Sequence, residues 1–164
     1  MDLPSYRILN LAQAFSSIVL MIIAIVYFEN ILKLEPCYLC MTQRVFVVAI
    51  GIICALAVVH NPRQLGQRVY AALSIVFVIM GIYFSGKQLW LQSLPKDQVP
   101  SCGLPVEYLL ENFSITEIFT KLLHGDGNCA ELKWQLLGLS IPGWVMVSFI
   151  VFGVLGIVQF LRKD

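Results

Sequence analysis

Long, uninterrupted apolar blocks dominate the pattern of hydrophobic and polar positions along the chain. A bilayer core of about 30 Å needs about 20 apolar residues in helical form, because a helix satisfies its own backbone polar groups. Four blocks meet this requirement, and the sequence predicts transmembrane helices at Leu11–Phe28, Tyr38–Val59, Val69–Gly86 and Ile141–Leu161. We therefore expect an all-α membrane protein, a four-helix transmembrane bundle forming a single domain over residues 1–164, with both termini on one side.

Two loops, over residues 29–37 and 87–140, join the predicted helices on the side opposite the termini. Within the long loop, Val106, Leu109, Leu110 and Phe113 fall at helical spacing. The stretch Ser114–Glu117 has the form of a capping box that opens a second short helix, which should end at Gly125. The apolar stripe of these short surface helices suits either the membrane surface or the tops of the bundle helices.

Composition agrees with a membrane protein. The chain is 59% hydrophobic and 13% charged, and its mean hydropathy is +0.81, whereas soluble proteins carry about 25% charged residues. The net charge is +1 and no basic stripe is present, so the sequence excludes nucleic acid as a partner. The lipid bilayer is the expected surrounding.

The basic residues of the short flanking segments set the expected orientation. They are Arg7, Arg63, Arg68, Arg162 and Lys163, all close to predicted helix ends on the side of the termini. Short loops rich in Lys and Arg stay in the cytoplasm. The termini and the loop at 61–67 are therefore expected to be cytoplasmic, and loops 29–37 and 87–140 to lie on the other side.

Four of the five cysteines fall on the side expected to be oxidising, namely Cys37, Cys40, Cys102 and Cys129. The fifth, Cys54, lies about 21 Å along the second helix from Cys40, at 1.5 Å per residue. No disulfide spans that distance. We expect Cys54 to be a small buried apolar side chain.

The pair Cys37 and Cys40 forms a C-x-x-C motif at the start of the second helix. Half of a zinc site is one alternative, but Cys102 and Cys129 do not form a second close pair, so no metal is expected. Two structural disulfides are the other alternative, although a bridge between residues three apart closes almost no loop. A helix N-terminus lowers the pKa of a thiol, so the position favours a redox-active dithiol.

Arg44 follows Cys40 by four residues, on the same helical face and about 6 Å along the axis. A guanidinium inside the apolar boundary is costly, and it either extends to the headgroups or serves a function. The functional interpretation is that Arg44 stabilises the Cys40 thiolate and donates hydrogen bonds to a carbonyl oxygen of a quinone ring.

Three stretches resemble the disulfide bond formation protein B (DsbB) family. They are residues 36–44 (PCYLCMTQR), residues 87–95 leading to residues 99–103 (KQLWLQSLP and VPSCG), and residues 127–134 (GNCAELKW). The resemblance covers nearly the whole chain. It implies a multi-pass enzyme of the bacterial inner membrane that reoxidises a periplasmic thioredoxin-fold oxidase similar to DsbA. It also implies ubiquinone or menaquinone as the electron acceptor.

The resemblance also implies a role for each cysteine. Cys102 would form the mixed disulfide with the partner protein, and Cys129 would be its bonded mate. Cys37 would exchange with Cys129, and Cys40 would face the quinone beside Arg44. Many relatives have His at the position of Ser93, so this chain lacks an imidazole there.

Two other protein classes share parts of this pattern. The vitamin K epoxide reductase family also pairs a C-x-x-C motif with loop cysteines, but its motif usually follows those cysteines instead of preceding them. A membrane scaffold with structural disulfides is the non-enzymatic alternative, and it should not form a mixed disulfide with a soluble dithiol oxidase. His60 and His124 lie away from the cysteines in the predicted topology and are not candidate site residues.

Overall fold

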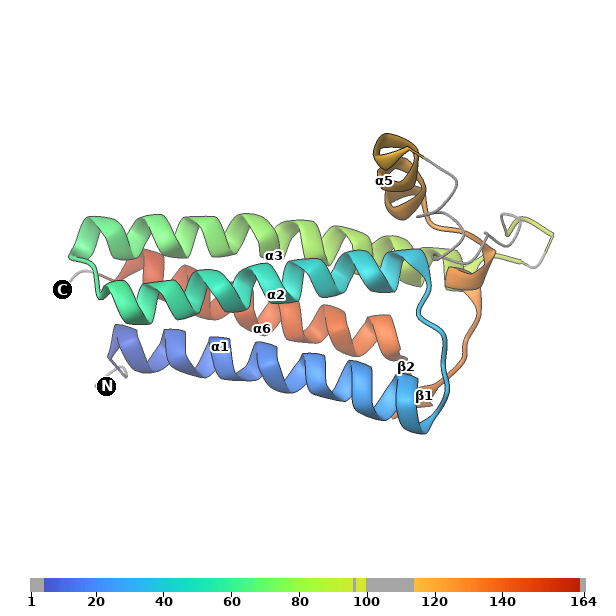
Figure 1. Ribbon diagram of the computed structural model, residues 1–164, viewed down its shortest axis with the longest axis horizontal. Coiled ribbons are helices and arrows are strands. Elements are labelled where there is room, and N and C mark those ends of the chain that lie inside the picture. Colours follow the sequence, from blue (N-terminus) through green and yellow to red (C-terminus); the bar gives the residue numbers. More distant parts are fainter. Residues whose placement is uncertain (1–4, 96, 100–113, 163–164) are drawn as a thin grey trace.

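Four long helices form the body of the protein in a computed structural model that describes residues 5–95, 97–99 and 114–162 (Figure 1). Each is long and apolar enough to cross a membrane. Their bounds are Tyr6–Ile22 for α1, continued by the π-helix η1 at Ile23–Ile31, then Tyr38–His60 for α2, Gln64–Ser93 for α3 and Ile141–Leu161 for α6. The all-α, four-helix prediction is confirmed, and both ends of the described chain lie at one end of the bundle.

The helices pack in chain order around the bundle. α1 packs on α2, α2 on α3 and α3 on α6, whereas α1 and α6 touch at few points. Near the termini these two helices are joined through Gln13 of α1, whose Nε2 donates to the carbonyl oxygen of Phe152 at 3.1 Å. Toward the other end their contacts are lost, and the space between them becomes part of the site described below.

Apolar side chains line both the inside and the outside of the bundle. Inside, Val47, Ile50, Val78 and Phe149 form a buried cluster, and the Phe149 ring lies so close to Gly81 that a Cβ there would be 2.4 Å from it. Outside, many large aliphatic side chains are exposed along all four helices. An all-round apolar surface is what a lipid environment requires.

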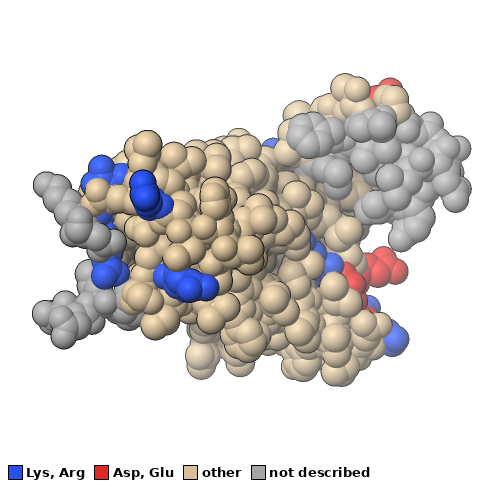
Figure 2. Space-filling model, turned by 60° about the vertical axis from the view of Figure 1, so that its left-hand side comes forward, with Lys and Arg blue, Asp and Glu red and all other residues tan. Residues whose placement is uncertain are grey.

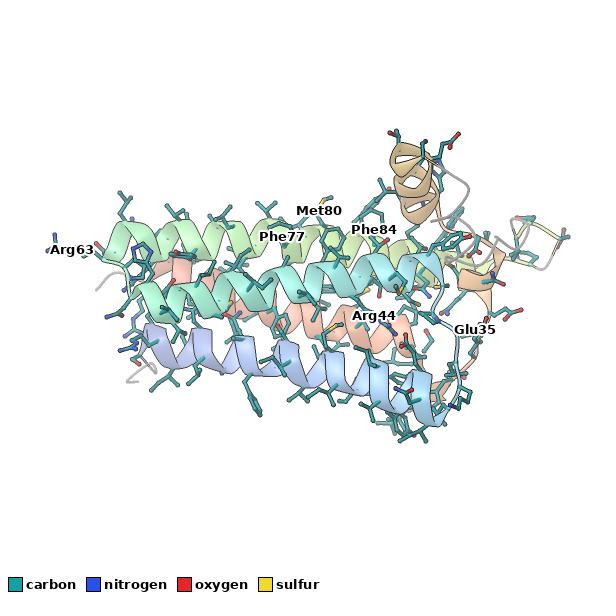
Figure 3. The ribbon with its side chains drawn as sticks, in the orientation of Figure 1. Glu35, Arg44, Arg63, Phe77, Met80 and Phe84 are labelled. Carbon is teal, nitrogen blue, oxygen red and sulfur yellow. The ribbon has the colours of Figure 1, made fainter. Side chains whose placement is uncertain are left out.

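Charge divides the two ends of the bundle. Arg63 lies at the end that holds the termini, whereas Arg44 and Glu35 lie at the opposite end (Figure 3). On the face shown in Figure 2, only Lys and Arg side chains are seen at the terminal end among the described residues, whereas the opposite end carries Asp and Glu side chains together with Lys and Arg. We call the opposite end the cysteine end, because Cys37 and Cys40 lie there.

The third helix is longer than predicted. It was expected to end at Gly86, but α3 continues to Ser93. The amine of Lys87, which broke the apolar pattern, donates to the backbone oxygen of Leu123 at 3.0 Å. That carbonyl lies in the last turn of the loop helix α5 (Ile115–His124), where a cation is favourable. The extension carries Gln88 into the bundle.

One arm of the predicted capping box of α5 is seen, since the backbone N–H of Ser114 donates to the Glu117 carboxylate at 3.1 Å, and the Ser114 hydroxyl donates to the same oxygen at 3.0 Å. The chain leaves this helix at Gly125, whose φ of 73° favours glycine. The helix expected near Val106–Phe113 lies outside the described residues.

A short hairpin was not predicted. Strands β1 (Gln135–Leu136) and β2 (Leu139–Ser140) pair antiparallel, with Gln135 opposite Ser140. Both turn residues, Leu137 and Gly138, have positive φ, at 53° and 81°, as a two-residue hairpin turn of the tight primed type requires. A 3₁₀ turn, η2 (Gly127–Ala130), precedes the hairpin and carries Cys129.

Candidate active site

Cys37 and Cys40 lie at the N-terminus of α2, as predicted. Cys37 is the N-cap residue, and its Sγ accepts a hydrogen bond from the backbone N–H of Cys40 at 3.4 Å. The two sulfur atoms are 2.9 Å apart. The backbone N–H of Cys40 thus points at the Cys37 sulfur, and the N-terminus of a helix favours negative charge.

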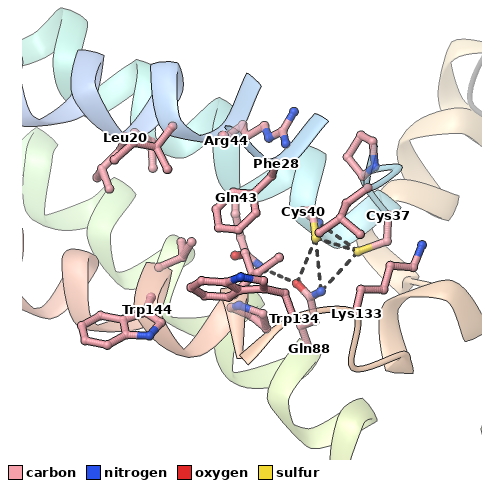
Figure 4. Close-up of a pocket in the computed structure, with 18 of the residues that line it drawn as sticks. Leu20, Phe28, Cys37, Cys40, Gln43, Arg44, Gln88, Lys133, Trp134 and Trp144 are labelled. Carbon is pink, nitrogen blue, oxygen red and sulfur yellow. Dashed lines mark hydrogen bonds between the residues drawn. The ribbon is translucent and has the colours of Figure 1, made fainter. Parts of the chain in front are cut away.

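Gln88 of α3 contacts both sulfurs, and the sequence did not identify it as a site residue. Its Nε2 donates to Cys37 Sγ and to Cys40 Sγ, each at 3.2 Å (Figure 4). Its Oε1 accepts hydrogen bonds from Cys40 Sγ at 3.6 Å and from Gln43 Nε2 at 2.7 Å. Both glutamines are 3% exposed.

Cys129 joins the same cluster from the long loop. It is fully buried, packs in one apolar cluster with Cys37 and Leu39, and its thiol shares a hydrogen bond with that of Cys37. Its Sγ also donates to Asp126 Oδ1 at 3.2 Å. The structure thus brings three of the four predicted site cysteines together, while Cys102 lies outside the described residues.

The surroundings of Cys37 disfavour its thiolate. Hydrogen bonds to Cys129 and Cys40, in that order, and burial raise the pKa of the Cys37 thiol well above its usual range. Cys54, in contrast, lies far along α2 and is 1% exposed, as predicted.

Arg44 lies one turn after Cys40, but its guanidinium forms an ion pair with the carboxylate of Glu29. A second contact runs from Arg44 Nη1 to Met41 Sδ at 3.9 Å. Glu29 belongs to η1, the π-helix that ends the first span, and π-helical turns are frequent at functional sites. The predicted proximity of Arg44 to Cys40 is present, and Glu29 is a partner that the sequence did not predict.

A cavity of about 290 Å³ opens beside Cys40. Its walls come from α1 and η1 on one side and from α6 on the other, the two helices that scarcely touch. Phe28 and Trp134, whose ring centroids are 5.1 Å apart, form part of the lining. Polar groups reach it from Arg44 and Gln92. A flat, largely apolar molecule with carbonyl oxygens fits such a lining.

Sequence reasoning missed the residues that surround the cysteines, namely Gln43, Gln88, Glu29 and Asp126. One signal was available, because Gln43 interrupts an apolar helix beside Arg44, and a polar group at such a position is costly. No comparable signal marked Asp126, which is one of many polar residues in its loop.

Comparison with known proteins places this arrangement in one family. The family model described as "Disulfide bond formation protein DsbB" matches residues 6–159. Proteins named disulfide bond formation protein B are 42% identical in Saccharophagus degradans, over 98% of this chain and 96% of theirs, and 42% identical in Stutzerimonas stutzeri, over the full length of both. One from Marinobacter nauticus is 48% identical, over 84% of this chain and 82% of its own. The chain belongs to the DsbB family of thiol:quinone oxidoreductases, multi-pass membrane enzymes of protein disulfide bond formation.

Proposed function

We propose that the protein reoxidises a periplasmic thioredoxin-fold oxidase similar to DsbA, and passes the two electrons through Cys102–Cys129 and Cys37–Cys40 to a membrane quinone, either ubiquinone or menaquinone. The observation that carries this proposal is the cavity between α1 and α6, because Cys40 forms part of its wall. The overall reaction balances, since a dithiol gives two electrons and two protons and a quinone accepts both to become a quinol.

The size and lining of the cavity support a quinone headgroup. Small-ligand pockets usually measure about 300–1,000 Å³, so about 290 Å³ suits a single substituted ring. A long isoprenoid tail would leave between α1 and α6, past Leu20 and Ile23, which also line the cavity. Arg44 would donate to a ring oxygen, and Trp134 would pack on the ring.

The protein's own groups are arranged for thiol exchange between the two cysteine pairs. The Cys129 thiol gives its proton to Asp126, whose Oδ1 is 3.2 Å from Cys129 Sγ, and the thiolate attacks Cys37 Sγ. A bond forms between Cys129 and Cys37, the bond between Cys37 and Cys40 breaks, and the electron pair stays on Cys40 Sγ. Cys40 thereby becomes a thiolate beside the cavity.

Quinone reduction by the purified, detergent-solubilised chain tests this function. A reduced thioredoxin-fold oxidase is supplied in excess, and the absorbance change of ubiquinone-1 or menadione is followed. We expect one quinone reduced for each disulfide formed in the partner. Turnover in which the partner is oxidised without quinone loss would contradict the proposal, as would the absence of a mixed disulfide with the partner in a Cys129→Ala variant.

Orientation in the inner membrane needs a separate test. We expect the cysteine end to face the periplasm, because the basic ends of the helices collect at the terminal end. A membrane-impermeant maleimide added to reduced, intact cells should label Cys102 but not a cysteine placed at Gln64. The reverse labelling pattern would invert the topology.

A further inference from the structure

We infer that Gln88 is a catalytic residue, a fixed pair of N–H donors that stabilises the thiolate formed on Cys40 when the Cys37–Cys40 disulfide opens, and that Gln43 is the positioning residue that holds its amide. This inference rests on the proposed electron path and assigns the group that stabilises its central intermediate.

The geometry of the Gln88 amide carries the inference. A primary amide has two N–H donors, and the single nitrogen of Gln88 lies 3.2 Å from each of the two sulfurs. The amide nitrogen can therefore donate to either sulfur. The same group can follow the negative charge whichever sulfur carries it, without moving its backbone.

Gln43 fixes the direction of that amide. Gln43 Nε2 donates to Gln88 Oε1 at 2.7 Å, which holds the oxygen near Gln43 and leaves the nitrogen as the amide atom nearer to the sulfurs, at 3.2 Å against 3.6 Å for the oxygen and Cys40 Sγ. Gln43 lies on α2, one turn after Cys40, and Gln88 lies on α3. The contact thus joins the helix that carries the dithiol to the helix that supplies the donors (Figure 4).

A neutral donor suits this position better than a cation. Buried hydrogen bonds to ionised groups are stronger than those between neutral groups, and an amide supplies them without placing a second charge in an apolar region. The guanidinium of Arg44, in comparison, is already paired with Glu29. Gln88 therefore serves the sulfur, while Arg44 remains at the wall of the cavity.

The step that Gln88 assists is a thiol–disulfide exchange in which the atoms and electrons balance among the protein's own cysteines. When Cys129 attacks Cys37, the Cys37–Cys40 bond breaks and its electron pair moves to Cys40 Sγ. No oxidant is consumed in this step, because one disulfide replaces another. The N–H donors of Gln88 bond more strongly to the thiolate than to the disulfide sulfur, so they lower the energy of the product and of the transition state that leads to it.

The test measures the Cys40 thiolate directly. The full-length protein is reduced with dithiothreitol in detergent, and the iodoacetamide alkylation of Cys40 is followed by peptide mass spectrometry at pH 6.5 and pH 9.5. Gln88→Met keeps the length of the side chain but removes the donors. We expect the ratio of the pH 6.5 rate to the pH 9.5 rate to fall at least tenfold. Gln88→Glu, which replaces the donors with a carboxylate, should lower it further.

Gln43→Met tests the positioning role, because it leaves Gln88 in place. It should lower the same ratio severalfold, and Gln43→Asn should restore part of it. Gln13→Met is the matched control, since Gln13 is another buried glutamine of the bundle and is 1% exposed. It should leave Cys40 alkylation unchanged and thereby show that loss of a buried amide is not itself the cause.

Two outcomes would overturn the inference. One is a Cys40 alkylation ratio in Gln88→Met within twofold of the unmodified protein. The other is an equal fall in Gln13→Met, which would indicate a general loss of structure. Neither measurement needs quinone or partner protein, so failure of the proposed function, seen as absent quinone reduction by the unmodified chain, is distinguishable from failure of the role of Gln88. If Gln88→Met does not fold, the Gln43 and Gln88→Glu variants decide the question.

Discussion

The bundle contains two buried clusters in which a cysteine contacts glutamine amides, and they differ in the amide atoms that contact the sulfur. At the cysteine end, Gln88 Nε2 donates to Cys40 Sγ at 3.2 Å, and Gln88 Oε1 accepts from the same sulfur at a longer 3.6 Å. Toward the terminal end, Cys54 Sγ donates to Gln13 Oε1 at 3.5 Å. An oxygen accepts the proton of a thiol, whereas an N–H stabilises a thiolate. The contacts of the first cluster therefore suit both the thiol and the thiolate, and the contact of the second suits the thiol.

The orientation of each amide follows from its other partner. Gln13 Nε2 donates to the carbonyl oxygen of Phe152 at 3.1 Å, which holds the nitrogen toward α6 and leaves the oxygen as the atom that contacts Cys54. Gln159 adds a donor to that oxygen at 3.2 Å. Gln88 has the opposite constraint, because Gln43 donates to its oxygen. A neighbouring residue in each cluster thus selects which amide atom lies nearer to the sulfur.

The largest expected difference between the two clusters is the loss of quinone reduction when the cysteine of each cluster is replaced by Ala. Cys40→Ala removes the sulfur that borders the cavity and should abolish quinone reduction, by at least about 10³-fold, as expected when a covalent intermediate cannot form. Cys54→Ala removes a sulfur that is 1% exposed and should change turnover less than twofold. Quinone reduction with saturating reduced partner measures both. Comparable losses in the two variants would mean that the electron path includes Cys54.

Charge is the second difference between the two clusters. The ion pair of Arg44 and Glu29 lies at the cysteine end, whereas the side chains that bond around Cys54 include the neutral amides of Gln13 and Gln159. Arg44→Ala should lower quinone-dependent turnover by about 10²–10³-fold, the usual cost of removing one donor to a developing oxyanion. Arg44→Lys should recover only part, because an ammonium lacks the planar fork of donors. Arg63→Ala, at the opposite end of the bundle (Figure 3), is the matched control. Equal quinone KM and kcat in all variants would leave Arg44 as a membrane-interface anchor.

A smaller effect is expected on the alkylation rate of Cys37, which should rise when Cys129 is replaced. The hydrogen bond to Cys129 is the largest of the causes that raise the pKa of Cys37, so Cys129→Ala should lower that pKa toward its ordinary value. A lower pKa means more thiolate at pH 8, and the alkylation of Cys37 there should rise about tenfold for each pKa unit recovered. The alkylation rate of a free cysteine peptide at pH 8 serves as the reference for both proteins. A fall in the rate at pH 8 would show that Cys129 favours the Cys37 thiolate.

Part of this arrangement could be predicted from the sequence and part could not. The four spans followed from uninterrupted apolar blocks, and the dithiol at the start of α2 followed from the spacing of Cys37 and Cys40, because both signals are local. The end of α3 was placed too early, since Lys87 finds its acceptor on α5, far away in the sequence. Gln88 lies just beyond that predicted end, and for this reason it was left in a loop.

The contacts among distant residues were likewise beyond sequence reasoning. The pairing of Arg44 with Glu29 depends on the π-helical end of the first span, and a π-helix has no pattern that distinguishes it from an α-helix of similar composition. The orientation of a glutamine amide depends on a partner from another helix. Local patterns therefore locate the cysteine pair at the start of α2, but tertiary packing decides which groups surround it.

The smallest expected effect is on the free energy of unfolding and comes from the Gln13 cluster near the terminal end. Gln13 takes part in three contacts, with Phe152, Cys54 and Gln159, and these join α1 to α2 and α6. Hydrogen bonds between transmembrane helices contribute about 0.6 kcal/mol each on average, so Gln13→Met should lower the free energy of unfolding by about 1–2 kcal/mol. Unfolding in mixed micelles, followed by circular dichroism, measures this change. Quinone reduction by the folded fraction should remain within twofold of the unmodified protein, because Gln13 has no contact with the cavity or the dithiol. A large loss of turnover at unchanged stability would contradict the division into a redox cluster and a structural one, since it would place Gln13 in the reaction instead of in the packing of α1 against α6.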